Sequence, residues 1–306
     1  MNNGLFNEII KYCDEYYKNC KQNGIKCSEG CSHDHCICNG FCSSCMEELT
    51  WNKPNGRTNY DCERLTAYYV CKFLNRFSSE IYHAINSSFV SDKLIGFEKF
   101  NILSLGCGPA SDMIAFDSFN KNNMPNPVDI YYRGVDIAEA WRHIHIKLEQ
   151  LSEENNYSQP LFSYSDVFEK ISDAPIKDVN ILVVQNLIST FIRTGSDNKL
   201  NMFLDDLIIN VINYMPNNSI IIINDINSCN LLRDRWLRDV ITKLKSSSRG
   251  GHYNIMYFDR NYGNANWIKH LNSSIEFEYP TEFNPNSYEH WDNCSSVQLL
   301  ITLEDS

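Results

Sequence analysis

The residues best suited to binding chemistry form a glycine turn between an apolar run and a polar helix start. The run 102–105, Ile-Leu-Ser-Leu, is typical of a buried strand. Gly106 and Gly108 follow it, and glycines let the backbone bend sharply and approach a ligand closely. Ser111 then opens a predicted helix, whose free N–H groups and positive dipole end face the same place. Strand, turn and helix start together predict a nucleotide-binding pocket.

The second chemical feature is a concentration of cysteines near the start of the chain. Ten of the 13 cysteines lie between residues 13 and 71, and six thiols and two imidazoles fall within residues 27–45. That stretch has few large apolar side chains, so it cannot build a core and needs another source of order. Thiolates around Zn²⁺ supply such order, since the free energy of metal binding becomes free energy of folding.

We therefore predict structural zinc in the N-terminal region. Cys42-Ser-Ser-Cys45 is the clearest pair, because a two-residue gap lets both sulfurs bind one tetrahedral ion. The other ligands stay open, and enough thiols exist for one or two closed sites without a catalytic water. An iron–sulfur cluster, inert thiols and redox-active thiols are the alternatives. The predicted metal ligands are Cys27, Cys31, Cys36, Cys38, Cys42, Cys45 and Cys62, with His33 and His35 as further candidates.

Composition limits the class of protein. The 306 residues are 43% apolar, and no apolar run approaches the roughly 18–20 residues of a membrane span, so no membrane partner is expected. The net charge of −11 disfavours extensive DNA binding, which needs clustered cations. The first residues show no signal-peptide pattern, which favours a cytoplasmic protein with reduced thiols over a disulfide framework.

The N-terminal third is predicted to be helical around the cysteine-rich segment. We expect a helix at 4–21, a loop at 50–60 and a long helix at 61–88 with Asp61 as its N-cap. We interpret the apolar stripe of the long helix as core, with a substrate wall as the alternative. The stripe consists of Leu65, Tyr69, Phe73, Phe77, Ile81 and Ile85.

From residue 99 onward strands and helices alternate, which is typical of a parallel α/β sheet. This divides the chain into a helix plus cysteine-rich segment at 1–60, a linking helix at 61–96 and an α/β domain at 97–306. The predicted strands are 101–105, 130–135, 160–164, 180–185, 219–224, 252–258 and 296–303, with a long polar loop between the last two. The predicted helices are 111–118, 138–152, 168–172, 197–214 and 229–246.

The sequence Ile-Leu-Ser-Leu-Gly-Cys-Gly-Pro at 102–109 resembles motif I of class I S-adenosylmethionine-dependent methyltransferases. The resemblance covers residues 97–306 and implies an α/β fold with a Rossmann-like seven-stranded methyltransferase sheet. The cysteine-rich, zinc-binding helical region at the N-terminus lies outside it. A nicotinamide-linked oxidoreductase is disfavoured, because Ser111 stands where its G-x-G-x-x-G motif needs a third glycine.

The resemblance also implies roles for residues at successive strand ends. In this family the carboxylate at the position of Asp136 accepts the ribose hydroxyls. The one at the position of Asp166 takes the adenine amino group, while Val167 lies beneath the ring. Gln185 and Asn186 occupy the position that faces the transferred methyl and are the candidate catalytic residues. Taken singly, both aspartates could instead be helix N-caps. The implied cofactor-binding residues are Leu105, Gly106, Cys107, Gly108, Asp136, Ile137, Asp166, Val167 and Gln185.

The expected function is that of a methyltransferase whose acceptor is not identified by the sequence. The run from Gln185 to Ile188 is not the Asn/Asp-Pro-Pro-aromatic motif of enzymes that methylate amino groups of nucleic acids. A Pro-Cys nucleophile, typical of carbon-5 cytosine enzymes, is also missing near strand four. Small molecules, protein side chains and other RNA positions remain as acceptors. The alternative is a catalytically degenerate methyltransferase-like fold that acts as a zinc-anchored interaction module.

Overall fold

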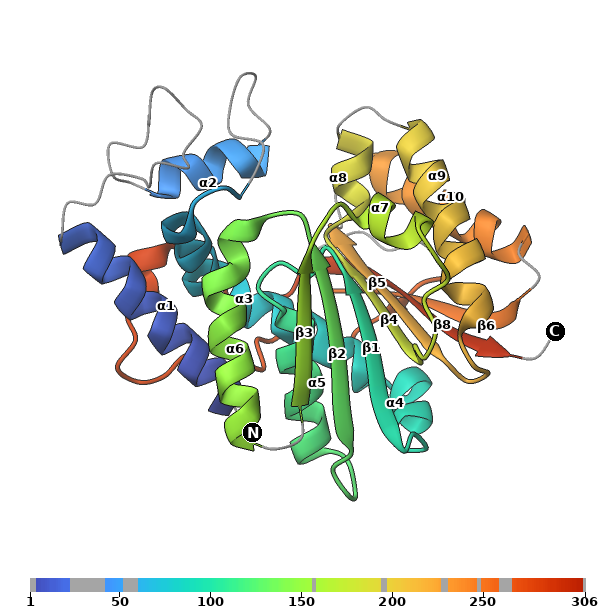
Figure 1. The fold of residues 1–306 in the computed structure, drawn as a ribbon, viewed down its shortest axis with the longest axis horizontal. Helices are drawn as coiled ribbons and strands as arrows, with labels where there is room; N and C mark the ends of the chain where they lie inside the picture. The colour runs from blue at the N-terminus through green and yellow to red at the C-terminus, as the bar shows by residue number, and fades with distance from the viewer. Residues whose placement is uncertain are drawn as a thin grey trace.

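The computed structural model describes residues 4–22, 42–51, 60–155, 158–193, 197–226, 231–246, 249–258 and 266–304. Within these ranges the chain forms one mixed sheet between two layers of helices (Figure 1). The strands are β1 (Lys99–Leu105), β2 (Asp129–Asp136), β3 (Ser158–Tyr164), β4 (Ile181–Gln185), β5 (Ile220–Ile226), β6 (Gly250–Tyr257), β7 (Ile268–Lys269) and β8 (Ser296–Glu304).

The strand order is β3-β2-β1-β4-β5-β8-β6-β7. Strands β1 to β5 are parallel, and β8 lies antiparallel between β5 and β6. The sequence predicts seven strands, whereas the described residues form eight. The additional strand is β7, which lies inside the segment predicted as a loop. It pairs parallel to β6, with Met256 opposite Ile268. Two residues are too short to give a periodic signal, so this strand exists through its tertiary pairing.

Alternate residues of the central strands belong to two separate cores. Ile102 contributes to one core, whereas Leu103 and Leu105 contribute to the other. The same alternation occurs in β4 and β5, because successive side chains of a strand point to opposite faces. Continuous apolar runs therefore mark strands that are buried on both sides.

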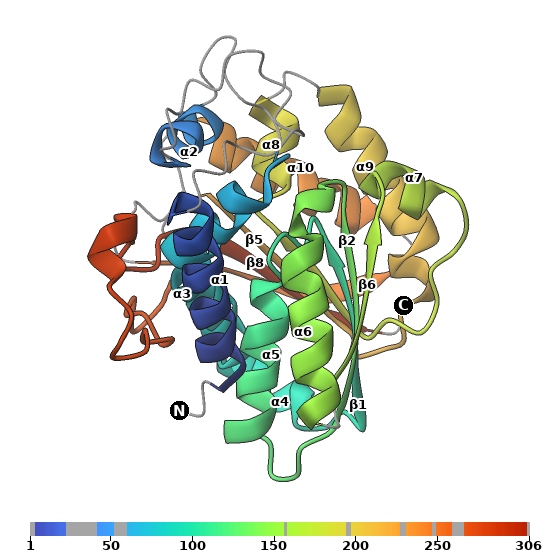
Figure 2. The same ribbon diagram turned by 60° about the vertical axis from the view of Figure 1, so that its left-hand side comes forward.

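The helices divide between the two faces. On one face lie α1 (Gly4–Gln22), α3 (Glu63–Ile85), α5 (Ser111–Asn122) and α6 (Arg142–Asn155), seen side by side in Figure 2. On the other lie α7 (Val167–Ser172), α8 (Ile188–Arg193), α9 (Asp197–Asn210) and α10 (Leu231–Ser246). Short elements complete the fold: α2 (Cys42–Trp51), α4 (Ser88–Leu94), and single 3₁₀ turns at Glu139–Trp141, Ile212–Tyr214 and Pro285–Tyr288. Among the described helices, none is long and apolar enough to span a membrane.

Several predicted boundaries need correction. The helix predicted at 61–88 is α3 alone, ended by the C-cap Asn86, and a separate helix α4 follows. Asp61 is not the N-cap, since Cys62 holds that position and makes no side-chain cap hydrogen bond. The helix predicted at 197–214 ends at Asn210 and continues as a 3₁₀ turn. The predicted loop at 50–60 is wrong for its first two residues, which belong to α2, and residues 52–59 lie outside the described residues.

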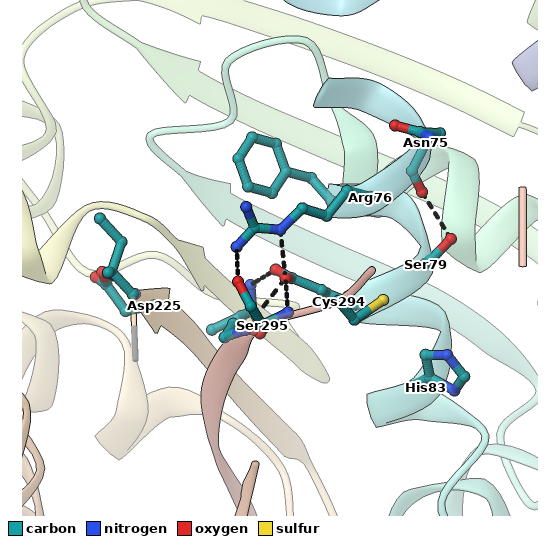
Figure 3. Close-up of polar contacts among 12 residues, drawn as sticks. Asn75, Arg76, Ser79, His83, Asp225, Cys294 and Ser295 are labelled. Carbon is teal, nitrogen blue, oxygen red and sulfur yellow. Dashed lines mark hydrogen bonds and ion pairs between the residues drawn. The ribbon is translucent and has the colours of Figure 1, made fainter. Parts of the chain in front are cut away.

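A buried glutamate fixes α3 against the sheet. Glu80 Oε1 accepts a hydrogen bond from Arg76 Nε at 2.8 Å, and Glu80 Oε2 accepts one from Asn224 Nδ2 of β5 at 3.1 Å. The backbone N–H groups of Ser295 and Ser296 also donate to Oε1, at 2.9 and 3.2 Å. Figure 3 shows two of these partners, Arg76 and Ser295, hydrogen-bonded to each other. Burial alone would raise the pKa of Glu80, but Arg76 and these donors hold it below its usual value. The long helix is therefore held in one position beside the strand ends.

Candidate functional site

A cavity of about 710 Å³ opens where the carboxyl ends of β1, β2, β3 and β4 meet. Its size lies within the roughly 300–1,000 Å³ of small-molecule sites, and its place is where open α/β sheets bind ligands. Leu105 lies in the core and does not line the cavity. The other eight predicted cofactor-binding residues all do: Gly106, Cys107, Gly108, Asp136, Ile137, Asp166, Val167 and Gln185.

The glycine turn has the backbone that its sequence predicted. Gly106 and Gly108 have φ angles of 69° and 49°, a region that side chains make costly. A Cβ at Gly106 would also come within 3.2 Å of Leu187 Cδ1. The N–H groups of Gly106 and Cys107 donate to the carbonyl of Val135, at 2.8 and 3.0 Å. The turn is thus tied to β2, and its open side faces the cavity.

Asp136 connects the turn to the end of β2. Its Oδ2 accepts a hydrogen bond from the Gly108 N–H at 2.8 Å, and its Oδ1 accepts one from the Ala138 N–H at 2.9 Å. Burial raises the pKa of this carboxyl, while the backbone donors act in the opposite direction. A carboxylate has about four lone-pair sites, so two bonds leave acceptor capacity toward the cavity.

His145 contacts the backbone of the glycine turn and was not among the residues predicted from the sequence. Its Nε2 lies 2.7 Å from the Gly108 carbonyl oxygen, and its Nδ1 lies 2.9 Å from the Tyr164 hydroxyl. A carbonyl only accepts, so Nε2 carries the proton and Nδ1 accepts from the tyrosine. The ring stacks on Phe162 at 3.8 Å, and burial lowers the pKa of His145 to about 4. A histidine 37 residues after the turn gives no local signal of this contact.

Asp166 caps the following helix. Its Oδ1 accepts a hydrogen bond from the Phe168 N–H at 2.9 Å at the start of α7. Asp166 is therefore a helix N-cap, as the alternative interpretation proposed, and it uses one carboxylate oxygen for this role. The role is compatible with ligand binding, because Asp166, Val167 and Phe168 all line the cavity.

Gln185 is held rigidly, and neither of its polar atoms is a base. Its Oε1 accepts a hydrogen bond from Ser111 Oγ at 2.6 Å, and its Nε2 donates to the Phe77 carbonyl at 3.1 Å. Gln185 thus joins β4 to α5 and α3. The neighbouring Asn186 lines the cavity with a left-handed backbone, φ 55°, and its N–H donates to the Asn224 carbonyl at 2.8 Å. Both candidate catalytic residues shape the cavity wall.

The apolar stripe of α3 is partly core and partly cavity wall. Leu65, Phe73, Ile81 and Ile85 are buried in the core, as predicted. Tyr69 and Phe77 instead line the cavity, together with Tyr60 and Trp141, which the sequence analysis did not select.

Three of the seven predicted zinc ligands lie within the described residues. Cys42 and Cys45 lie three residues apart in the first turn of α2, and Cys62 directly precedes α3. All three are buried. Cys27, Cys31, Cys36 and Cys38, with His33 and His35, lie outside the described residues. Within the described ranges no three His, Cys, Asp or Glu side chains come together as a metal site.

The strand order of β1 to β5, with an antiparallel strand next to β5, is that of a methyltransferase-like Rossmann sheet. No protein-family model matches the sequence, and no curated protein sequence matches it. Solved structures show distant similarity at low identity. A protein from Listeria monocytogenes, assigned as a class I S-adenosylmethionine-dependent methyltransferase, shares 8% identity at a TM-score of 0.49, over 99% of this chain and 89% of that one.

Two further structures are similar over shorter parts of the chain. A protein from Methanococcus maripaludis, assigned as an S-adenosyl-L-methionine-dependent methyltransferase, shares 14% identity at a TM-score of 0.37, over 62% of this chain and 75% of that one. The [4+2]-cyclase SpnF shares 9% identity at a TM-score of 0.38, over 59% of this chain and 58% of that one. At these identities and scores the similarities do not indicate an activity, which has to be argued from the cavity itself.

Proposed function

We propose that this chain is an S-adenosylmethionine-dependent methyltransferase. One observation carries the proposal: the glycine turn, Asp136 and Asp166 end three adjacent parallel strands and line a single cavity. A glycine turn that lets a ligand approach, followed by carboxylates at the next two strand ends, suits an elongated nucleoside with hydroxyl and amino donors.

The residues fit that cofactor in a definite order along the cavity. Asp166 and Val167 would hold the adenine, Asp136 would accept the ribose hydroxyls, and the backbone at Gly106 and Gly108 would border the amino-acid end. Asp136 has acceptor capacity left after bonding Gly108 and Ala138. When bound, S-adenosylmethionine supplies a methyl group on a positively charged sulfonium.

The protein's contribution to this chemistry is positioning and exclusion of water. Displacement at a methyl group needs the acceptor in line with the bond that breaks, so orientation supplies much of the rate. The rigid side chain of Gln185 and the backbone at Asn186 fix the wall at the end of β4. An amide is not a proton acceptor at neutral pH, so we assign Gln185 a positioning role.

Calorimetric titration with S-adenosylhomocysteine, and separately with NAD, tests the proposal. We expect binding of the first and none of the second. Asp136→Ala should weaken S-adenosylhomocysteine binding by ~2 kcal/mol, since charge-assisted hydrogen bonds are lost. The matched control is Asp129→Ala, at the exposed opposite end of the same strand, which should bind like the wild type.

Failure to bind S-adenosylhomocysteine in a folded protein would contradict the proposal and favour the alternative, a methyltransferase-like fold used as an interaction module. Binding of NAD instead would indicate an oxidoreductase. An unchanged affinity of Asp136→Ala, with normal binding by the wild type, would show that the ribose lies elsewhere in the cavity.

We also propose structural zinc in the N-terminal region, bound by cysteines from the set predicted above. Cys42 and Cys45 share one turn of α2, and residues three apart on a helix are neighbours on its surface. Cys62 directly precedes α3, the helix against which α2 packs. The cysteine spacing and these placements support the proposal, and the metal content of the protein tests it.

A further inference from the structure

Four aromatic side chains form a continuous wall along one side of the cavity; three are partly buried, and the fourth, Trp141, is buried behind them at 2% exposure. Tyr60 lies just before α3, Tyr69 and Phe77 come from α3, and Trp141 comes from the 3₁₀ turn before α6. The Tyr60 ring centroid lies 5.3 Å from that of Tyr69 and 5.2 Å from that of Trp141. Tyr69 lies 5.4 Å from Trp141 and 5.9 Å from Phe77. These distances are those of favourable ring pairs, so each ring fixes its neighbours.

The wall lies beside the glycine turn. A Cβ built on Gly108 would be 3.9 Å from Trp141 Cζ2. At its other end, the Phe77 carbonyl accepts the hydrogen bond from Gln185, at the end of β4. The wall therefore spans the region between Gly108 and Gln185. In the proposed arrangement of the cofactor this is the amino-acid end, where the methyl group is presented.

The cavity is large enough for a second ligand against this wall. Its volume of about 710 Å³ lies in the upper half of the range of roughly 300–1,000 Å³ for small-molecule sites, which leaves space beside a bound nucleoside. None of the four aromatic residues belongs to the strand ends that would hold the cofactor. A rigid wall of rings next to the reacting group is a surface on which a planar molecule stacks.

The charges around the cavity select among planar molecules. Within the described residues, the acidic side chains that line it are Asp61, Asp136, Glu139 and Asp166, and the one basic side chain is Lys199. Glu139 is 74% exposed and lies 3.6 Å from Arg142, so the negative charge facing the cavity comes from the three aspartates. Carboxylates beside a partly enclosed cavity repel an anion more strongly than they would in water. Aromatic faces act in the same sense, because their negative quadrupole attracts cations.

We propose that the methyl acceptor is a small aromatic or heteroaromatic molecule without negative charge, bound against Tyr60, Tyr69, Phe77 and Trp141. This inference rests on the proposed methyltransferase function. In the transfer, a lone pair on an acceptor nitrogen or oxygen forms the new bond to the methyl carbon. The methyl–sulfur bond breaks, its electron pair stays on sulfur as a neutral thioether, and the acceptor heteroatom releases its proton to water.

A set of three indoles isolates the effect of charge on binding. Tryptamine carries a cation, 3-methylindole is neutral, and indole-3-acetate is an anion on the same ring system. Equilibrium dialysis with the full chain and saturating S-adenosylhomocysteine gives the three affinities. We expect tryptamine and 3-methylindole to bind about tenfold more tightly than indole-3-acetate, or better.

Variants of the wall test where the rings bind. Tyr69→Leu and Tyr60→Leu should each weaken tryptamine binding about tenfold, because stacking area is lost. Both should leave S-adenosylhomocysteine affinity within about threefold of the wild type, which also shows that the cavity still folds. Tyr253→Leu is the matched control, since Tyr253 lies in β6, is 39% exposed and does not line this cavity.

The inference is overturned if indole-3-acetate binds as tightly as tryptamine, if none of the three indoles binds, or if both wall variants bind tryptamine normally. Labelled methyl transfer in a cell extract that reaches only RNA or protein would also overturn it. A wild-type protein that does not bind S-adenosylhomocysteine would contradict the proposed function instead. The two failures are therefore distinguished by the cofactor measurement alone.

Discussion

At the scale of single residues, His145 shows how a group outside the cavity determines the backbone inside it. Its Nε2–H donates to the Gly108 carbonyl, while Asp136 accepts from the N–H of the same glycine. Both polar groups of Gly108 are thus fixed from opposite sides. Because the Phe162 ring stacks on His145, the imidazole has little freedom to turn. The turn is therefore prepared for a ligand before one binds.

The buried imidazole makes stability depend on pH. Burial lowers the pKa of His145 to about 4, below the ~6.5 of an unfolded chain. The unfolded state then binds the proton more readily, so stability is lost as the pH falls from about 6.5 toward 4. We expect urea unfolding to show that His145→Phe loses ~2 kcal/mol less than the wild type between pH 7 and pH 5.

The control for this prediction is His252→Gln, at an exposed histidine near the start of β6. This variant should keep the pH dependence of the wild type. Burial also lowers the pKa of His143 and of His270 to about 4, so both variants keep these two acid-sensitive groups and only part of the pH dependence should change in His145→Phe. Equal pH dependence of His145→Phe and wild type would contradict the assignment.

At the scale of elements, α3 is the part that combines structure with the cavity. One side of the helix is core, and Tyr69 and Phe77 reach the cavity. Glu80, further along the helix, holds it to β5 and to the start of β8. The hydrogen bonds of Glu80, one turn after Phe77 in α3, therefore help to fix the position of the aromatic wall relative to the glycine turn.

Removing the Glu80 carboxylate should destabilise the protein strongly. Glu80→Ala leaves the buried Arg76 guanidinium and several backbone and side-chain donors without their acceptor, and breaking a buried pair in this way costs ~3–5 kcal/mol. Glu80→Gln keeps an oxygen for part of the network and should lose less. Urea unfolding at pH 7 measures both variants.

Glu98→Ala is the matched control, because Glu98 is exposed at the approach to β1 and should change stability little. A loss below ~1 kcal/mol for Glu80→Ala would mean that the network relaxes or that water replaces the carboxylate.

At the scale of the whole molecule, one sheet with two cores gathers residues from distant parts of the sequence. Tyr60, Trp141 and Gln185 border one cavity although 125 residues separate the first from the last. The α1 and α3 residues share a core with the sheet, so the N-terminal helices are packed on the α/β layer. We therefore expect zinc bound by Cys42, Cys45 or Cys62 to stabilise the whole fold.

Metal content tests that expectation. We predict about one to two zinc ions per chain by elemental analysis, from the number of thiolates that four-coordinate sites consume. Removal by a chelator should lower the unfolding temperature, since metal-binding free energy is folding free energy. The double variant Cys42→Ser, Cys45→Ser should have a reduced zinc content. The control variant Cys294→Ser changes a buried cysteine outside the N-terminal region and should keep the zinc content of the wild type. A folded, zinc-free wild type would contradict the prediction.

The sequence by itself determined the parts that local patterns encode. The apolar runs of the central strands, the glycine turn and the aspartates at two strand ends were predicted, because residues close in sequence fix strand ends and turns. Parallel strands then place successive carboxyl ends at one edge, so their convergence also followed. The acceptor remained open, since no local motif near Gln185 specified it.

Only the tertiary structure decided which further side chains complete the site. His145 under Gly108, the partners of Glu80, the aromatic wall with Tyr60 and Trp141, and the short strand β7 all depend on contacts between distant segments. Such contacts leave no periodic pattern, because each is set by how two packed elements meet. The charge and shape of the cavity depend on these contacts between distant segments, and so does the class of acceptor that we propose.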